Sequence, residues 1–131
     1  MNWSFGSLFG VADTAGGRKI EAVFAGRPQL DDESFFQRYY AGTDVKKEVA
    51  IGVRHAFQAH LMFDMQRLAP SDSFKEELNF VWKYDSLADV ELICQIEKQF
   101  TVDITEAEGR DASTMGDLIR LVDAKLKKKN A

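Results

Sequence analysis

Apolar residues recur at every fourth position near the middle of this chain. The four positions are Val49, Val53, Phe57 and Leu61. They share one face of an α-helix, because the helix repeats every 3.6 residues. The two-residue alternation of half-buried strands is nearly absent, and residues 101–105 form the one β-like run. The pattern predicts an all-α bundle whose amphipathic helices bury their apolar faces against one another.

Start and stop signals place two helices in the N-terminal half. Asp31 can cap a helix that ends near Gly42, because aspartate binds the free N–H groups of a first turn and glycine suits the residue after a last turn. Thr43 and Asp44 can then cap the helix that carries the stripe of four. Pro70 marks a break, since proline disfavours helix at the residue before it.

A third helix is predicted to begin at Asp85-Ser86, with one apolar side directed inward. Its predicted inner positions are Leu87, Val90, Ile93, Ile96 and Phe100. Cys94 stands among them, and no histidine lies near it in sequence to activate its sulfur. We therefore predict that Cys94 is a buried structural thiol.

Two capping signals predict the last helices. Thr105 is followed by Glu108 three residues later, the spacing of a capping box, which predicts a short helix over residues 105–109. Ser113 or Thr114 begins the final helix. Its predicted inner positions are Met115, Leu118, Ile119, Val122 and Leu126.

The first thirty residues differ in composition from the rest. They hold five of the nine glycines, which resist helix, together with aromatic residues that a purely solvated linker lacks. The aromatic residues are Trp3, Phe5, Phe9 and Phe24. We interpret residues 1–30 as a flexible arm. It is either a poorly ordered terminus or a docking arm for a partner or a membrane surface.

Charge narrows the class of partner. The 131 residues include 21 acids and 17 bases, a net charge of −4, which excludes the basic footprint of a nucleic-acid-binding protein. Residues 44–126 hold sixteen acids and ten bases, whereas the tail over 127–131 holds three lysines. A partner that binds the middle of the chain through charge is expected to be basic.

The composition also indicates the compartment. A single cysteine rules out an internal disulfide framework and a cysteine-rich zinc site. No apolar run approaches the roughly 18–20 residues that span a bilayer. No basic residue precedes the apolar N-terminal stretch, as one would in a secretory signal. We expect a cytoplasmic protein.

Catalytic and metal-binding constellations are weak. His55 and His60 are five residues apart, so they do not share a helical face as a metal-binding pair at i, i+4 would. Asp103 and Glu106 are explained as part of a solvated face. We predict no metal site and no catalytic residue.

Ser86 has a chemically distinctive predicted position. It directly follows the capping Asp85, in a first turn where backbone N–H groups are unpaired and the helix dipole is positive. A phosphate ester on its hydroxyl would be favoured there, because helix N-termini bind anions. The alternative is that Asp85 and Ser86 only cap the helix.

The segment DSLADVELICQIEKQF over residues 85–100 resembles the modification motif of acyl carrier proteins. The similarity continues over residues 53–74, 100–105 and 113–122, and spans about 45–126 in total. In that family the motif serine carries a 4′-phosphopantetheine group, whose thiol holds acyl groups as thioesters.

The resemblance implies a fold and an attachment site. It implies a four-helix bundle, with three long helices and one short, over residues 44–126, preceded by an added helix over 31–43. Ser86 would carry the phosphopantetheine, with Asp85 and Leu87 beside it. The protein would be a monomer that catalyses nothing itself, because the reactive thiol belongs to the prosthetic group.

The resemblance also implies partners. An acidic helix face would bind a phosphopantetheinyl transferase and the acyl-processing enzymes of lipid or fatty acid biosynthesis; its residues would be Asp89, Glu91 and Glu97. An apolar interior that can shelter an acyl chain would be lined or supported by Leu87, Val90, Cys94 and Ile96. The alternative is an interaction module with the same fold that is never modified and acts through its N-terminal arm.

Overall fold

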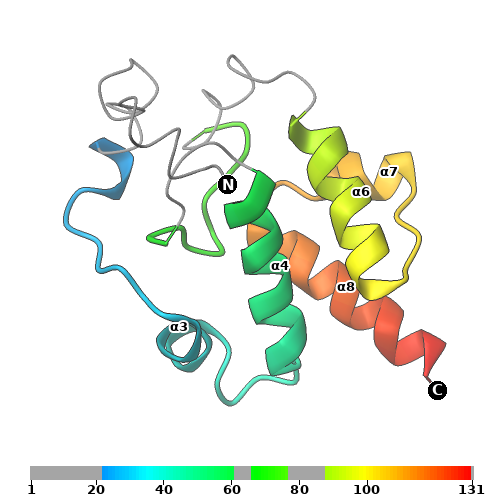
Figure 1. The fold of residues 1–131 in the computed structure, drawn as a ribbon, viewed down its shortest axis with the longest axis horizontal. Coiled ribbons are helices and arrows are strands. Elements are labelled where there is room, and N and C mark those ends of the chain that lie inside the picture. The colour runs from blue at the N-terminus through cyan, green and yellow to red at the C-terminus, as the bar shows by residue number, and fades with distance from the viewer. Residues whose placement is uncertain (1–21, 61–65, 77–87, 131) are drawn as a thin grey trace.

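The computed structural model describes residues 22–60, 66–76 and 88–130. Figure 1 shows the helices in this part of the chain. They are α3 (Asp32–Tyr39), α4 (Lys47–His60), α6 (Ala88–Phe100), α7 (Glu106–Asp111) and α8 (Met115–Lys129). The described residues form no strand, apart from an isolated bridge between Ser73 and Thr114. The predicted all-α class is confirmed, and no described helix is long and apolar enough to cross a membrane.

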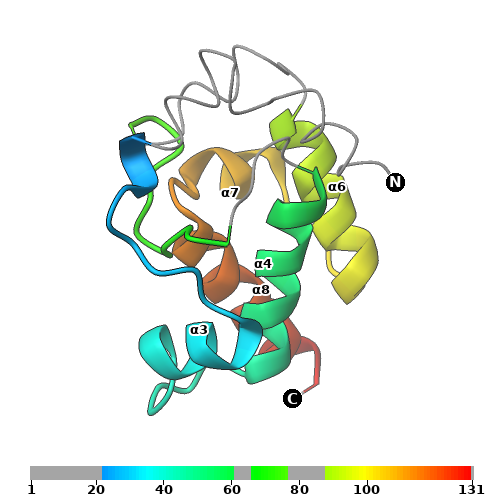
Figure 2. The same cartoon turned by 60° about the vertical axis from the view of Figure 1, so that its left-hand side comes forward.

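Helix α4 is the centre of the arrangement. It packs against α6 and α8 on one side and against the additional helix α3 on another (Figures 1 and 2). The predicted stripe accounts for this position, since Val49, Val53 and Phe57 are all fully buried. Leu61, the fourth member of the predicted stripe, lies outside the described residues.

A glycine permits the close contact between α4 and α6. A Cβ atom at Gly52 would lie 2.5 Å from Cζ of Phe100, well inside van der Waals contact. The amide of Gln99 also donates to the Gly52 carbonyl at 3.1 Å. Any larger residue at position 52 would push these side chains away from α4.

The capping signals predicted for the last two helices are confirmed. At α7, the Glu108 N–H donates to Thr105 Oγ1 at 3.1 Å, and the Thr105 N–H donates to the Glu108 carboxylate at 2.9 Å. At α8, Thr114 and Asp117 form the same reciprocal pair. The predicted inner residues of α8 are also buried, except that Leu126 is only half-buried.

The predicted start of α4 is wrong by two or three residues. Helix α4 begins at Lys47, after the predicted cap at Thr43 and Asp44. The Lys46 N–H instead donates to Asp123 of α8 at 3.1 Å, and Asp44 forms an ion pair with Lys127 at 3.1 Å. The helix start is therefore set by a buried carboxylate 77 residues away, which local sequence signals do not reveal.

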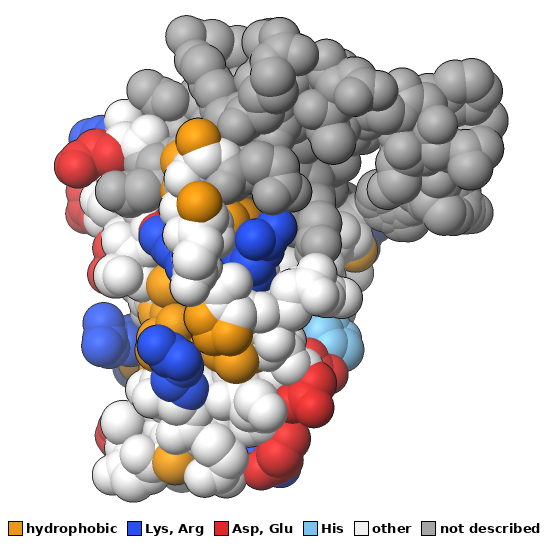
Figure 3. Space-filling view, turned by 90° about the vertical axis from the view of Figure 1, so that its left-hand side faces the viewer, with side chains coloured by type: hydrophobic (Ala, Val, Ile, Leu, Met, Phe, Trp, Pro, Cys, Tyr) orange, Lys and Arg blue, Asp and Glu red, His pale blue; other side chains and the backbone are white. Residues whose placement is uncertain are grey.

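Helix α3 is capped as predicted and joined firmly to α4. The Asp31 carboxylate accepts the Ser34 N–H at 2.8 Å. The outer surface of α3 carries cation–aromatic contacts, in which Arg38 lies 5.7 Å from the Tyr39 ring centre and Lys47 of α4 lies 5.8 Å from that of Phe36. Figure 3 shows this side of the molecule, with apolar side chains interleaved with basic ones.

The predicted inner face of α6 is wrong at two positions. Val90 is 55% exposed and Cys94 is exposed, whereas Leu92 and Ile96 are buried. Ile93 and Phe100 are half-buried. The reason is geometric, because each helical residue turns by about 100°. Cys94 is therefore turned by about 200° from Leu92, which is buried. The prediction that Cys94 is a buried structural thiol is therefore wrong, because this residue is exposed.

Candidate functional site

The predicted attachment site lies just before the described part of α6. Asp85, Ser86 and Leu87 are outside the described residues, and the helix is described from Ala88 onward. Asp89 lies on α6, but its side chain is outside the description as well. On this helix, the structure therefore describes the side chains from Val90 onward, which follow the attachment motif in the sequence.

The predicted acidic face of α6 divides into two different environments. Glu91 is exposed. Glu97 is half-buried, and its carboxylate accepts the Ile104 N–H at 2.9 Å. Glu97 thereby holds the connection between α6 and α7, while Glu91 is directed to solvent.

Two further acids, on α7, are engaged in ion pairs. Glu106 pairs with Arg110 one turn later, and Glu108 pairs with Lys125 of α8 at 2.9 Å. The Thr105 N–H, together with Lys125, holds the pKa of Glu108 below its ordinary value. These carboxylates stabilise α7 and its contact with α8.

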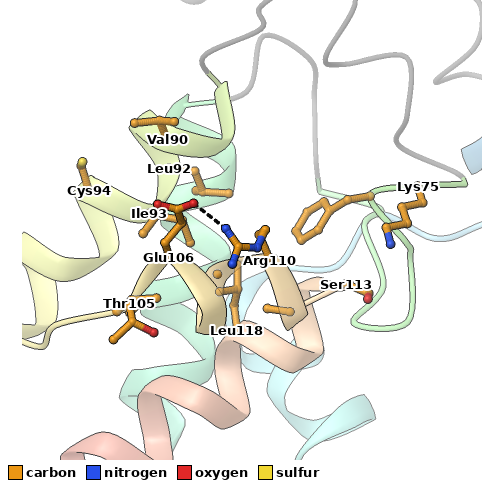
Figure 4. Close-up of a pocket in the computed structure, with 14 residues that line it drawn as sticks. Lys75, Val90, Leu92, Ile93, Cys94, Thr105, Glu106, Arg110, Ser113 and Leu118 are labelled. Atoms are coloured by element: carbon orange, nitrogen blue, oxygen red, sulfur yellow. Dashed lines mark hydrogen bonds and ion pairs between the residues drawn. The ribbon is translucent and has the colours of Figure 1, made fainter.

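A pocket of about 360 Å³ lies between α6, α7, the start of α8 and the segment that contains Phe74. Figure 4 shows side chains from all four elements around it. Its lining is mainly apolar and includes Phe74, Val90, Leu92, Ile93, Ile104 and Leu118. Two residues predicted to line or support an apolar interior, Val90 and Cys94, border this pocket, and Ile96 is in the core behind it.

The polar residues at this pocket are few. Lys75, Glu106 and Arg110 are exposed, and the ion pair between Glu106 and Arg110 lies beside the opening (Figure 4). An apolar recess with charged groups at its edge suits an apolar chain whose other end stays in water. Sequence patterns did not identify Lys75 or Arg110, because these two residues come from separate segments that meet at the pocket only in the folded chain.

The wall formed by Phe74 is held at several points. Its ring stacks on Phe57 of α4 with centres 5.7 Å apart. Its backbone N–H donates to the Ser113 carbonyl, and the Gly116 N–H donates to the Pro70 carbonyl, both at 2.9 Å. The pocket therefore has a fixed wall on this side. The described residues contain no cluster of histidine, cysteine, aspartate or glutamate that could hold a metal ion.

The curated proteins that this chain is similar to include two acyl carrier proteins. The chain is 26% identical over 81 residues to the acyl carrier protein of an Exiguobacterium species, covering 62% of this chain and 98% of that protein. It is 31% identical over 81 residues to the acyl carrier protein of Thermosynechococcus vestitus, covering 62% of this chain and 95% of that protein. No family model matches the chain, and no solved structure matches it.

Proposed function

This chain belongs to the acyl carrier protein family, and we propose that it carries acyl groups as thioesters on a 4′-phosphopantetheine arm attached to Ser86. The observation that carries the proposal is the similarity to acyl carrier proteins over nearly their whole length, joined to the motif at Asp85, Ser86 and Leu87. The arm supplies the thiol that holds the acyl group. The chain's own residues position the arm, shelter its cargo and bind partners.

The pocket beside α6 fits this role. Val90 follows Ser86 by four residues, a separation of at most about 14 Å in any conformation. An arm on Ser86 can therefore deliver an acyl chain to the apolar lining formed by Ile93 and Leu118. Burial of each CH₂ group there would contribute about 0.8 kcal/mol. Val90 and Cys94 would line the entrance, and Ile96 would support the interior.

The proposed partners are a phosphopantetheinyl transferase and acyl-processing enzymes, both bound through the acidic side of α6. Glu91 is the exposed acid there, with Asp89 and Glu97 as the other proposed contacts. Contacts between exposed charges are weak and screened by salt, so exchange between partners would be fast. A carrier that visits several enzymes needs such exchange.

Further features belong to the same proposal. The chain would act as a cytoplasmic monomer without catalytic activity of its own. Residues 44–126 would form the carrier, residues 31–43 an added helix, residues 1–30 an arm and residues 127–131 a basic tail. The described tail residues already contact the carrier, since Lys127 pairs with Asp44 and Lys129 donates to the Thr101 carbonyl at 2.8 Å.

Mass spectrometry tests the attachment directly. The protein is co-expressed with a transferase of broad specificity, and its mass is expected to rise by one phosphopantetheine group. The Ser86→Ala variant should keep its original mass. An unmodified mass, under conditions that modify a control carrier, would overturn the proposal and favour an interaction module that is never modified.

A further inference from the structure

The pocket beside α6 is open to solvent along one edge. Val90 is 55% exposed there, and the thiol of Cys94 is exposed on the same helix. Figure 4 shows both residues at the edge of the pocket, with Ile93 and Leu92 further in. A segment that covered this edge would remove the exposed part of Val90 and the adjoining apolar lining from water, and each Å² of apolar surface buried contributes about 25 cal/mol.

The N-terminal end of the described chain is fastened to the 66–76 segment, which contributes Phe74 to one wall of this pocket. Phe24 is buried, and its carbonyl accepts a hydrogen bond from Arg67 at 3.4 Å. The Arg27 guanidinium binds both carboxylate oxygens of Asp72, at 2.6 and 2.9 Å. Asp72 stands two residues before Phe74, which forms the wall. Figure 2 shows residues 22–30 beside the 66–76 segment.

The chain that precedes residue 22 can reach the pocket easily. Twenty-one residues span up to about 70 Å when extended, whereas a domain of this length has a radius of gyration of only about 14 Å. A tether of this kind also gives an effective concentration in the millimolar range. Even weak affinity of the N-terminal segment for the pocket would then produce high occupancy.

The composition of this segment complements the pocket. Residues 1–17 contain the large apolar side chains Trp3, Phe5, Leu8 and Phe9, and Asp13 is their only charged side chain. The pocket is apolar inside, and its three charged edge residues are Lys75, Glu106 and Arg110, with a net charge of +1. The two surfaces therefore match in hydrophobicity, and residues 3–9 bring no charged side chain into the apolar interior.

We infer that residues 3–9 dock their aromatic side chains into the pocket beside α6 and cover Cys94. This docking requires no modification of Ser86, so it stands independently of the proposed carrier function. If the chain is a carrier, the docked segment and an acyl chain would compete for the same apolar surface.

Cys94 reports on this docking because it is the chain's only cysteine. The rate at which a small aromatic disulfide labels the thiol is measured in Ser86→Ala protein, which excludes a second thiol from a prosthetic group. The full chain is compared with a variant lacking residues 2–17 and with the triple variant Trp3→Ala, Phe5→Ala, Phe9→Ala. A matched control changes the interleaved polar residues: Asn2→Ala, Ser4→Ala, Ser7→Ala.

Labelling should accelerate about tenfold in the truncated and aromatic variants if the segment covers the thiol nine-tenths of the time. The polar control should label like the full chain, and thermal melts should show all variants folded. A peptide of residues 1–17 added to the truncated protein should restore slow labelling. Equal rates in all variants would overturn the inference. A rate in the full chain that falls as protein concentration rises would overturn it too, since a second copy would then be the occupant.

Discussion

The Arg54 guanidinium on α4 donates to the Asp32 carboxylate on α3 at 3.0 Å, across the junction between the additional helix and the bundle. The two side chains differ in environment, since that of Arg54 is 2% exposed and that of Asp32 is 41% exposed. Arg54 also donates to the carbonyls of Leu30 and Gln66, and lies 4.8 Å from the Phe35 ring centre. One buried cation thus fastens three separate segments.

Replacing Arg54 should destabilise the protein far more than replacing Asp32. The Arg54→Met variant leaves the Leu30 and Gln66 carbonyls without this donor and removes the buried guanidinium from between the segments, and we expect a loss of about 3 kcal/mol in unfolding free energy. In Asp32→Asn the amide remains partly solvated and can still accept a hydrogen bond, so we expect a loss below about 1 kcal/mol. Denaturant unfolding of both variants measures the difference. Equal losses would show that the ion pair with Asp32, and not the hydrogen bonds to the two carbonyls, joins α3 to α4.

Local signals predicted much of the fold. The Thr105 and Thr114 caps each depend on a residue three positions later, so the sequence alone contains both partners. The apolar stripe of α4 was equally readable, because residues four apart share a face whatever the helix packs against. Both caps, and the three described residues of the stripe, were therefore predicted at the correct positions.

Features that depend on distant partners were not predicted. The start of α4 depends on Asp123, which is far away in sequence. On α6, the helical pattern allowed either of two neighbouring apolar faces to be buried, and the packing of the folded chain buries the one with Leu92 and Ile96. Cys94 and Val90 were therefore assigned to the wrong side. The pocket was partly missed for the same reason, since Phe74 and Leu118 meet only in the folded chain.

Two glycines should respond in opposite ways to alanine. A Cβ atom at Gly116 would lie 3.0 Å from the Pro70 carbonyl oxygen, which is backbone and cannot easily move. We expect Gly116→Ala to cost about 1–3 kcal/mol. At Gly109 the same atom would meet nothing within 4 Å, so Gly109→Ala should stabilise α7 by about 0.5–1 kcal/mol. Melting temperatures that move in the same direction for both variants would contradict this account.

Tyr40 should make the protein sensitive to alkali. Its hydroxyl is buried without a hydrogen-bond partner among the described residues, and burial raises the pKa of the phenol to about 12. The unfolded chain loses this proton near the ordinary pKa of 10, whereas the folded chain keeps it until about pH 12. The contribution of the neutral phenol to the free energy of unfolding is therefore complete below pH 10 and declines as the pH rises toward 12.

Tyr40→Phe should therefore reduce the loss of stability between about pH 10 and 12. At pH 7 its unfolding free energy should stay within about 1 kcal/mol of the parent, because no described hydrogen bond is removed. Denaturant unfolding at both pH values tests this. A large loss at pH 7 would show that the hydroxyl has a partner in the folded chain, and the proposed origin of the alkaline sensitivity would be wrong.

Glu108 should contribute to stability in the opposite pH range. The Thr105 N–H and Lys125 lower its pKa below the ordinary value of 4.5, so the unfolded chain binds the proton first. Its contribution is present above pH 4.5 and is lost as the pH falls through the folded-state pKa. Glu108→Gln keeps the capping oxygen without the charge and should show a smaller acid-dependent loss. Lys125→Met should remove only part of this acid-dependent loss, because the Thr105 N–H still lowers the pKa of Glu108. If stability fell with acid equally in Glu108→Gln and the parent, Glu108 would not be the group responsible.

Charge reversal at Glu91 should weaken recognition by a transferase, if Ser86 is modified as proposed. Glu91 is an exposed acid on the helix that follows the attachment motif. Glu91→Lys replaces an attraction with a repulsion toward a basic partner, so the rate of Ser86 modification should fall roughly threefold to tenfold at low salt. Raising the salt concentration should bring the variant and parent rates together, because exposed charges are screened.

The matched control is Glu48→Lys, at an exposed acid in the first turn of α4. Similar slowing in both variants would show that net charge controls modification, and would remove the case for a partner surface on α6.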